Sequence, residues 1–113
     1  MSHVTPSHAA RATDHAVRRY LERVHRLDLG GPTVPDPEAL SRARAQGWDC
    51  DAVRRRLASL GGIILSAGMR DGAVVVPLER MTVRVTRGAV VTVVTPPVRT
   101  PRRAGRAPLR RAA

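Results

Sequence analysis

Three residues near the start of the chain carry side chains suited to phosphate chemistry. His15, Arg19 and Arg23 follow one another at intervals of four residues, so on a helix they share one face. Near a helix N-terminus the dipole disfavours an imidazolium, which leaves a neutral His15 able to accept a proton. The two arginines could bind a phosphate and stabilise its transition state. This set could cleave RNA without a metal, by activating a 2′-hydroxyl against its own phosphodiester.

The same spacing also fits a solvated helix face with an ordinary surface histidine, and the sequence leaves both interpretations open. Other arginines could extend a phosphate-binding surface. Arg54, Arg55 and Arg56 lie together in a later helical stretch, and Arg84 alternates with threonines in a strand-like stretch. Six more follow the last apolar run: Arg99, Arg102, Arg103, Arg106, Arg110 and Arg111. We predict that these ten arginines contact nucleic acid.

The overall charge indicates a polyanionic partner. All twenty basic residues are arginine, against nine acidic residues, which gives a formal net charge of +11 and a sequence pI of about 11.8. Such a field attracts nucleic acid. The arginine-rich end in particular should meet polyanions whether or not the rest of the chain has an activity.

Most motifs of cofactor and metal sites are missing. The chain has no G-x-x-x-x-G-K loop, no dinucleotide fingerprint and no H-E-x-x-H, and the single Cys50 excludes a cysteine-based zinc site. We therefore expect no metal and no cofactor. No apolar run approaches the roughly 20 residues of a membrane span, and the start lacks the apolar stretch of a signal peptide. We expect a cytoplasmic protein without membrane contact.

Three helices should position the candidate residues. The first begins at Thr13 as its N-cap, since apolar residues then recur every three or four positions. A connector over residues 28–35, rich in Gly and Pro, separates it from a second helix that starts at Asp36 and stops at Gly47. The third helix starts at Asp49 or Asp51 and should end at Gly61 and Gly62. The apolar stripe of the first helix is Val17, Tyr20, Leu21, Val24 and Leu27.

The second half of the chain reads as β-structure. Val-rich and Ile-rich runs are separated by turns at Gly68 to Gly72 and at Arg87-Gly88. Thr82, Arg84 and Thr86 alternate with apolar residues, which is typical of a strand with one buried face. The four predicted strands cover residues 63–65, 73–76, 81–86 and 89–95.

These elements predict an α+β fold. N-terminal helices should pack on one face of a four-stranded antiparallel sheet, arranged as a meander with its last strand at an edge. Residues 1–11 read as a flexible arm, and residues 12–95 as a single α+β domain. Residues 96–113 hold four prolines, six arginines and no acid, a composition that predicts a disordered basic C-terminal tail.

Two segments resemble a known family. The stretch TDHAVRRYLERV (residues 13–24) and the later stretch VTRGAVVTVVTP (residues 85–96) resemble the small ribonuclease-like domains of the barnase/EndoU/RelE superfamily, found in toxin–antitoxin and phage loci. The resemblance implies helices followed by an antiparallel sheet, and metal-independent RNA cleavage. It implies a site containing His15, Arg19 and Arg23, with Thr92 contributed from the last strand.

Two functions follow from the sequence. The first is a small ribonuclease or toxin-like enzyme, with His15 as general base or acid, Arg19 and Arg23 on the phosphate, and Thr92 as an auxiliary group. The second is a non-enzymatic basic module that docks on nucleic acid or on a phage or chromosome-associated assembly. RNA is the expected partner ahead of DNA. A cognate inhibitor or assembly protein is a further possible partner, and an interface with such a protein would leave no motif.

Overall fold

The computed structural model describes residues 10–96. The tail from residue 97 onward, including its six arginines, and residues 1–9 of the predicted arm lie outside the described residues. The helices are α1 (Asp14–Val24), α2 (Asp36–Ala45) and α3 (Cys50–Ser66), with a short 3-10 helix η3 (Pro77–Glu79). The strands are β1 (Arg11–Ala12), β2 (Gly72–Val76), β3 (Met81–Thr86) and β4 (Ala89–Val94).

Helix α1 forms where its cap and apolar spacing predict it. The Thr13 hydroxyl accepts a hydrogen bond from the Ala16 amide at 3.1 Å, which satisfies one of the free donors at the helix start. Val17, Tyr20 and Leu21 are buried, as their spacing requires. The opposite side of the helix is left to its polar residues.

Helix α2 begins one residue earlier than a cap at Asp36 would place it. Pro35 is the N-cap and makes no side-chain cap hydrogen bond, while Asp36 is the first helical residue. The Asp36 carboxylate is therefore not used on its own helix and faces α1. The helix ends at Ala45, just before Gly47, whose φ of 96° is the left-handed conformation that glycine adopts readily.

Helix α3 does not end at its glycine pair, so that prediction is wrong. It continues through Gly61 and Gly62 to Ser66, and the predicted strand over residues 63–65 forms its last turns. A Cβ atom at Gly61 would lie 2.5 Å from Cγ2 of Val90 and 2.8 Å from Cβ of Ala10. The glycine allows the helix to pack closely on the sheet.

The sheet is mixed, whereas the sequence predicted an antiparallel one. Its order is β1-β4-β3-β2, and β1 runs parallel to β4 while the other two pairs are antiparallel. The fourth strand is Arg11–Ala12, where the predicted arm meets the predicted domain, because residues 63–65 are helical. The α+β class and the number of strands are confirmed.

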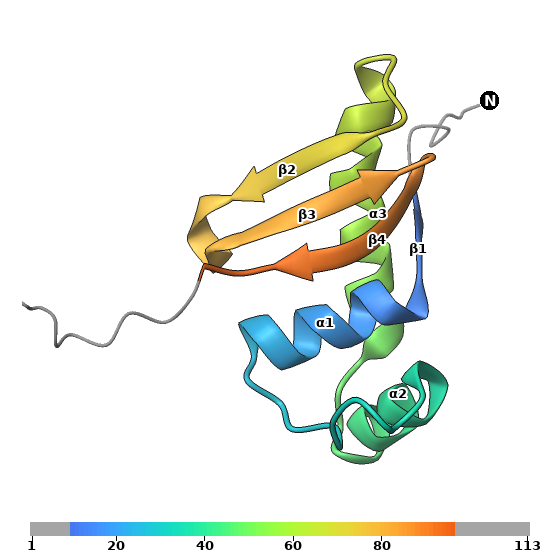
Figure 1. The fold of residues 1–113 in the computed structure, drawn as a ribbon, viewed down its shortest axis with the longest axis vertical. Helices are drawn as coiled ribbons and strands as arrows, with labels where there is room; N and C mark the ends of the chain where they lie inside the picture. Colours follow the sequence, from blue (N-terminus) through green and yellow to red (C-terminus); the bar gives the residue numbers. More distant parts are fainter. Residues whose placement is uncertain (1–9, 97–113) are drawn as a thin grey trace, which may run out of the picture.

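Strand β4 is not the outermost strand, in contrast to the meander prediction. β1 pairs only with its first two residues, Ala89 and Val90. Beyond that point α1 runs alongside β4 (Figure 1), and the Arg23 guanidinium donates to the Val93 carbonyl at 2.8 Å. Helix α1 thus occupies the sheet edge that the short β1 leaves open.

One face of the sheet is covered by helices and the other is open. Helix α3 passes behind the strands in Figure 1, and the described chain places no helix in front of them. Met81, Val83 and Val85 of β3 are buried on the helix side. Their alternating neighbours and the residues paired with them form the opposite surface, here called the outer sheet face. Its exposed and half-buried residues are Ala73, Val75, Thr82, Arg84, Thr86, Thr92 and Val94, while Ala89, the partner of Thr86, is buried.

Candidate functional site

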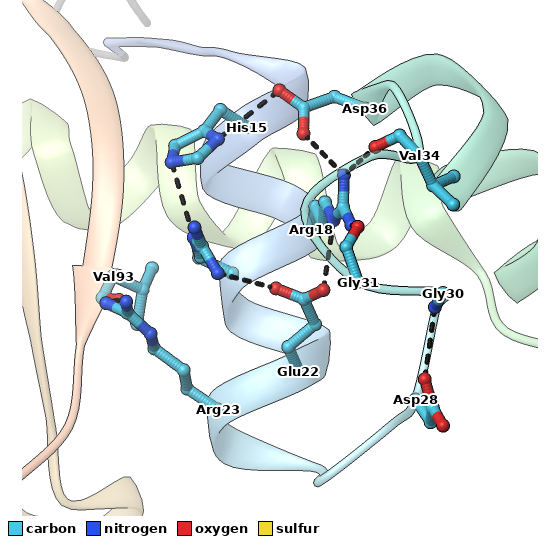
Figure 2. Close-up of polar contacts among 11 residues, drawn as sticks. His15, Arg18, Glu22, Arg23, Asp28, Gly30, Gly31, Val34, Asp36 and Val93 are labelled. Atoms are coloured by element: carbon cyan, nitrogen blue, oxygen red, sulfur yellow. Dashed lines mark hydrogen bonds and ion pairs between the residues drawn. The ribbon is translucent and has the colours of Figure 1, made fainter.

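His15 lies on the polar side of α1, opposite the start of α2 (Figure 2). Its Nδ1 is 3.3 Å from Oδ2 of Asp36, and its Nε2 is 3.3 Å from Nε of Arg19, which donates to it. The predicted neighbours His15 and Arg19 are therefore in contact. Asp36, which the sequence offered only as a helix start, is the third member of this set.

The two contacts select one tautomer of His15. A carboxylate can only accept a hydrogen bond, and a guanidinium can only donate one. Both contacts are satisfied when the hydrogen of the ring is on Nδ1 and the lone pair is on Nε2. The nitrogen that could accept a proton is thus the one beside Arg19. The His15 side chain is 44% exposed, so this nitrogen can be reached from solvent when Arg19 moves.

Arg18 is the buried charge of the site, and the sequence analysis missed it. Its side chain is 7% exposed and donates to Oε2 of Glu22 at 2.9 Å and to Oδ1 of Asp36 at 3.1 Å. It also donates to the carbonyls of Gly31 and Val34 in the connector. Burial alone would lower the pKa of Arg18, but the two carboxylates outweigh it and raise the pKa. Only the four-residue spacing to Glu22 was visible in the sequence.

Five side chains form a closed ring of contacts (Figure 2). Asp36 joins His15 to Arg18, and Glu22 joins Arg18 to Arg19 through its two oxygens. The Arg19–His15 contact closes the ring. Two guanidiniums balance two carboxylates, so the ring has no surplus of positive charge. A phosphate that binds Arg19 must compete with Glu22.

The ring borders a cleft of about 610 Å³ between α1 and the connector. Apolar residues of the connector, such as Leu29 and Val34, line its other wall. No strand residue is among those lining the cleft in the described part of the chain. His15 and Thr92 were predicted to share a cleft; Thr92 lies on β4 and does not line this one.

The structure places Thr92 in a second group of predicted residues. Thr92 is the cross-strand partner of Arg84, so both project from the outer sheet face. Arg84 is exposed, and no carboxylate pairs with it within residues 10–96. Arg23, through its bond to Val93, connects α1 to the residue next to Thr92.

The arginines of α3 divide into two kinds. Arg54 donates to the Ala12 carbonyl at 2.7 Å and pairs with Asp14, so it holds the β1–α1 junction. Arg56 pairs with Glu79. Arg55 is exposed. Two of the three predicted phosphate ligands on α3 are therefore occupied within the fold.

Glu79 joins α1 and α3 to η3. Oε2 of Glu79 accepts a hydrogen bond from the Tyr20 hydroxyl at 2.6 Å. Arg56 is in ion-pair contact with Oε1, which accepts no well-formed hydrogen bond within the described residues. Burial alone would raise the pKa of Glu79, but Tyr20 and Arg56 outweigh it and lower the pKa. Burial and the same carboxylate raise the pKa of Tyr20.

Comparison with protein-family models, with curated proteins and with solved structures finds no match to this chain. Across residues 10–96, no three His, Cys, Asp or Glu side chains are grouped so that they could hold a metal ion. None of the described helices combines the length and the apolar character needed to cross a membrane.

Proposed function

We propose that this protein binds nucleic acid, RNA ahead of DNA, through phosphate contacts on the outer sheet face. One observation carries the proposal. The outer sheet face presents an exposed arginine among threonine hydroxyls and contains no acidic residue. The carboxylates of α1 and the first residue of α2, by contrast, are in ion pairs with arginines of the helices.

The net positive charge of the described residues also favours a polyanionic partner. Residues 10–96 hold fourteen arginines and all nine acids of the chain, so this part is cationic without the tail. Arg80 directly precedes β3 and lines a hollow together with Thr82 and Val94 of the outer sheet face. A phosphate backbone crossing the sheet would meet guanidinium and hydroxyl donors along β3.

Binding of the full chain to a labelled RNA oligonucleotide, measured by fluorescence anisotropy at several salt concentrations, tests the proposal. Arg84→Gln should weaken binding and reduce the slope of log K against log salt by about 0.7 to 0.9, the value of one phosphate contact. Arg44→Gln on α2 is the matched control, since Arg44 is also exposed but lies on a helix away from the sheet. Equal effects of the two variants would remove the outer sheet face from the proposal. A duplex DNA competitor that displaces RNA at equal concentration would contradict the preference for RNA.

Metal-independent RNA cleavage at His15 is a second candidate, supported by the Asp36–His15–Arg19 contacts. In this reaction Nε2 of His15 accepts the proton of a ribose 2′-hydroxyl, and Arg19 turns to the phosphate. The 2′-oxygen attacks phosphorus, and the bond to the 5′-oxygen breaks. The imidazolium then returns its proton to the leaving oxygen, which gives a 2′,3′-cyclic phosphate and a 5′-hydroxyl.

Incubation of the full chain with RNA in the presence of a chelator tests this reaction. The expected products carry 2′,3′-cyclic phosphate ends, and His15→Ala should abolish them. His25→Ala is the control, because His25 contacts Tyr20 and Trp48, outside the ring. Cleavage that survives in His15→Ala would exclude His15 as the base. If the native chain gave no cyclic-phosphate products, the cleavage proposal would fail and only the binding function would remain.

A further inference from the structure

We infer that the outer sheet face takes double-helical RNA, which it binds by its backbone without stacking on bases. This inference rests on the proposed function and adds the class of RNA. It follows from the kinds of side chain on the face and from the positions of the two aromatic residues of the chain.

The outer sheet face combines hydrogen-bond donors with exposed apolar side chains, among them Val75 and Val94. Along β3 the side chains on this face are Thr82, Arg84 and Thr86, at every second position and therefore about 6.8 Å apart. Thr92 stands beside Arg84 on β4. Guanidinium and hydroxyl groups donate to phosphate oxygens, and a hydroxyl can also exchange hydrogen bonds with a ribose 2′-hydroxyl.

The aromatic side chains of the chain do not lie on the outer sheet face. The sequence contains one tyrosine, one tryptophan and no phenylalanine. Tyr20 is a buried residue of α1, and its hydroxyl donates to Glu79. Trp48 precedes α3 and packs against His25, with ring centroids 4.7 Å apart. Both residues belong to the helical side of the molecule.

Because neither aromatic residue lies on the outer sheet face, this face is suited to double-stranded RNA rather than to single-stranded RNA. Proteins that bind single strands on a sheet gain much of their affinity from bases stacked on aromatic side chains. In a duplex the bases already stack on one another, and the surface consists of phosphates and, in the wide minor groove of A-form RNA, of 2′-hydroxyls. The donors of the outer sheet face match that surface. The apolar side chains beside them are Ala73, Val75 and Val94.

The test compares the full chain on a 20-base-pair RNA duplex with its binding to unstructured oligo(U) and oligo(A) of the same length. We expect the duplex to bind about tenfold more tightly than either strand, and the two strands to bind within about twofold of each other, because no stacking platform distinguishes them. Thr92→Val, which keeps the shape and removes the hydroxyl, should weaken the duplex complex. Ser59→Ala on the exposed side of α3 is the hydroxyl control and should not change it.

Each outcome is decisive. Tighter binding of a single strand, or a clear preference for oligo(A), would overturn the inference while leaving the proposed RNA-binding function intact. Equal binding of duplex and single strands would overturn it as well. If none of the three RNAs bound, the proposed function itself would fail. Circular dichroism of each variant shows whether a loss of binding reflects a loss of fold.

Discussion

Arg18 shows how a single residue fixes the connector between α1 and α2. Its guanidinium reaches two carboxylates and two backbone carbonyls from a position that is almost fully buried. Such a charge stabilises the fold only while its partners remain, because an unpaired buried charge is costly. The conformation of residues 28–35 therefore depends on one side chain of α1.

We predict that Arg18→Met destabilises the protein by about 3 kcal/mol, since it removes the donor to Oδ1 of Asp36 and to the two connector carbonyls. Chemical denaturation of the full chain measures the change. Arg42→Met is the matched control: Arg42 pairs with Glu38 on the exposed side of α2, where an ion pair contributes less than about 1 kcal/mol. Similar losses of unfolding free energy in both variants would mean that the buried contacts of Arg18 stabilise the protein no more than an exposed ion pair does.

Glu79 gives stability a defined dependence on pH. Tyr20 and Arg56 lower the pKa of its carboxyl below the ordinary value of 4.5 despite its burial. The unfolded chain therefore binds its proton more readily, so this stabilisation is present above pH 4.5 and is lost as the pH falls through the lower folded pKa. Urea denaturation between pH 7 and pH 3 should show a steeper loss for the native chain than for Glu79→Gln. Glu38→Gln, at an exposed pair, should keep the native profile, and a native profile in Glu79→Gln would contradict the prediction.

At the scale of elements, α3 and β1 depend on each other through Gly61. The residue lies where α3 approaches Val90 of β4 and Ala10, which precedes β1. Ala10 also donates its amide to the Ala58 carbonyl of α3 at 2.9 Å. The two-residue strand β1 is therefore fixed by the helix beneath it as well as by β4.

Gly61→Ala should destabilise the protein, although alanine normally favours a helix interior over glycine by about 1 kcal/mol. The added Cβ would overlap with Val90 and Ala10, so we expect a net loss of about 1 to 3 kcal/mol, as in other overpacked cores. Thermal denaturation compares it with Ser59→Ala, an exposed position in the same helix. A gain in stability for Gly61→Ala would show that α3 and the sheet can separate without cost.

The same elements explain which parts of the fold the sequence could predict. Thr13 and the apolar spacing after it specify α1 locally, and the alternation in residues 81–86 specifies β3, so both predictions are confirmed. The Gly61-Gly62 pair is ambiguous, because glycine both ends helices and permits close packing. The close contact of Gly61 with Val90 and Ala10 shows that the pair serves helix packing. Residues 63–65 are therefore helical, and the fourth strand is instead β1, which pairs in parallel with β4 and makes the sheet mixed.

The candidate site was predictable to a similar degree. The spacing of His15 and Arg19 placed them together, and their contact is seen. Arg18 and Asp36 come together only when the connector folds back on α1. No local sequence pattern could therefore predict their contact. The cross-strand pairing of Arg84 with Thr92 likewise depends on the irregularity in register between Arg84 and Val85.

At the scale of the whole molecule, positive charge is divided between residues 10–96 and the segment that follows them. Residues 10–96 carry fourteen arginines and nine acids, while the remaining six arginines lie among residues 97–113 with no acid. The two parts can both contribute to nucleic-acid binding, and their contributions are separable because counterion release is counted per phosphate contact.

We predict that replacing the six arginines of residues 97–113 with glutamine in the full chain lowers the slope of log K against log salt by up to about five, since each phosphate contact contributes about 0.7 to 0.9. Arg84→Gln should then lower the remaining slope by about a further 0.7 to 0.9, the value of one phosphate contact on the outer sheet face. Anisotropy titrations with one RNA duplex across a salt series measure both changes. An unchanged slope after the six replacements would assign the binding to residues 10–96. No further effect of Arg84→Gln in the replaced chain would assign it to the arginine-rich segment.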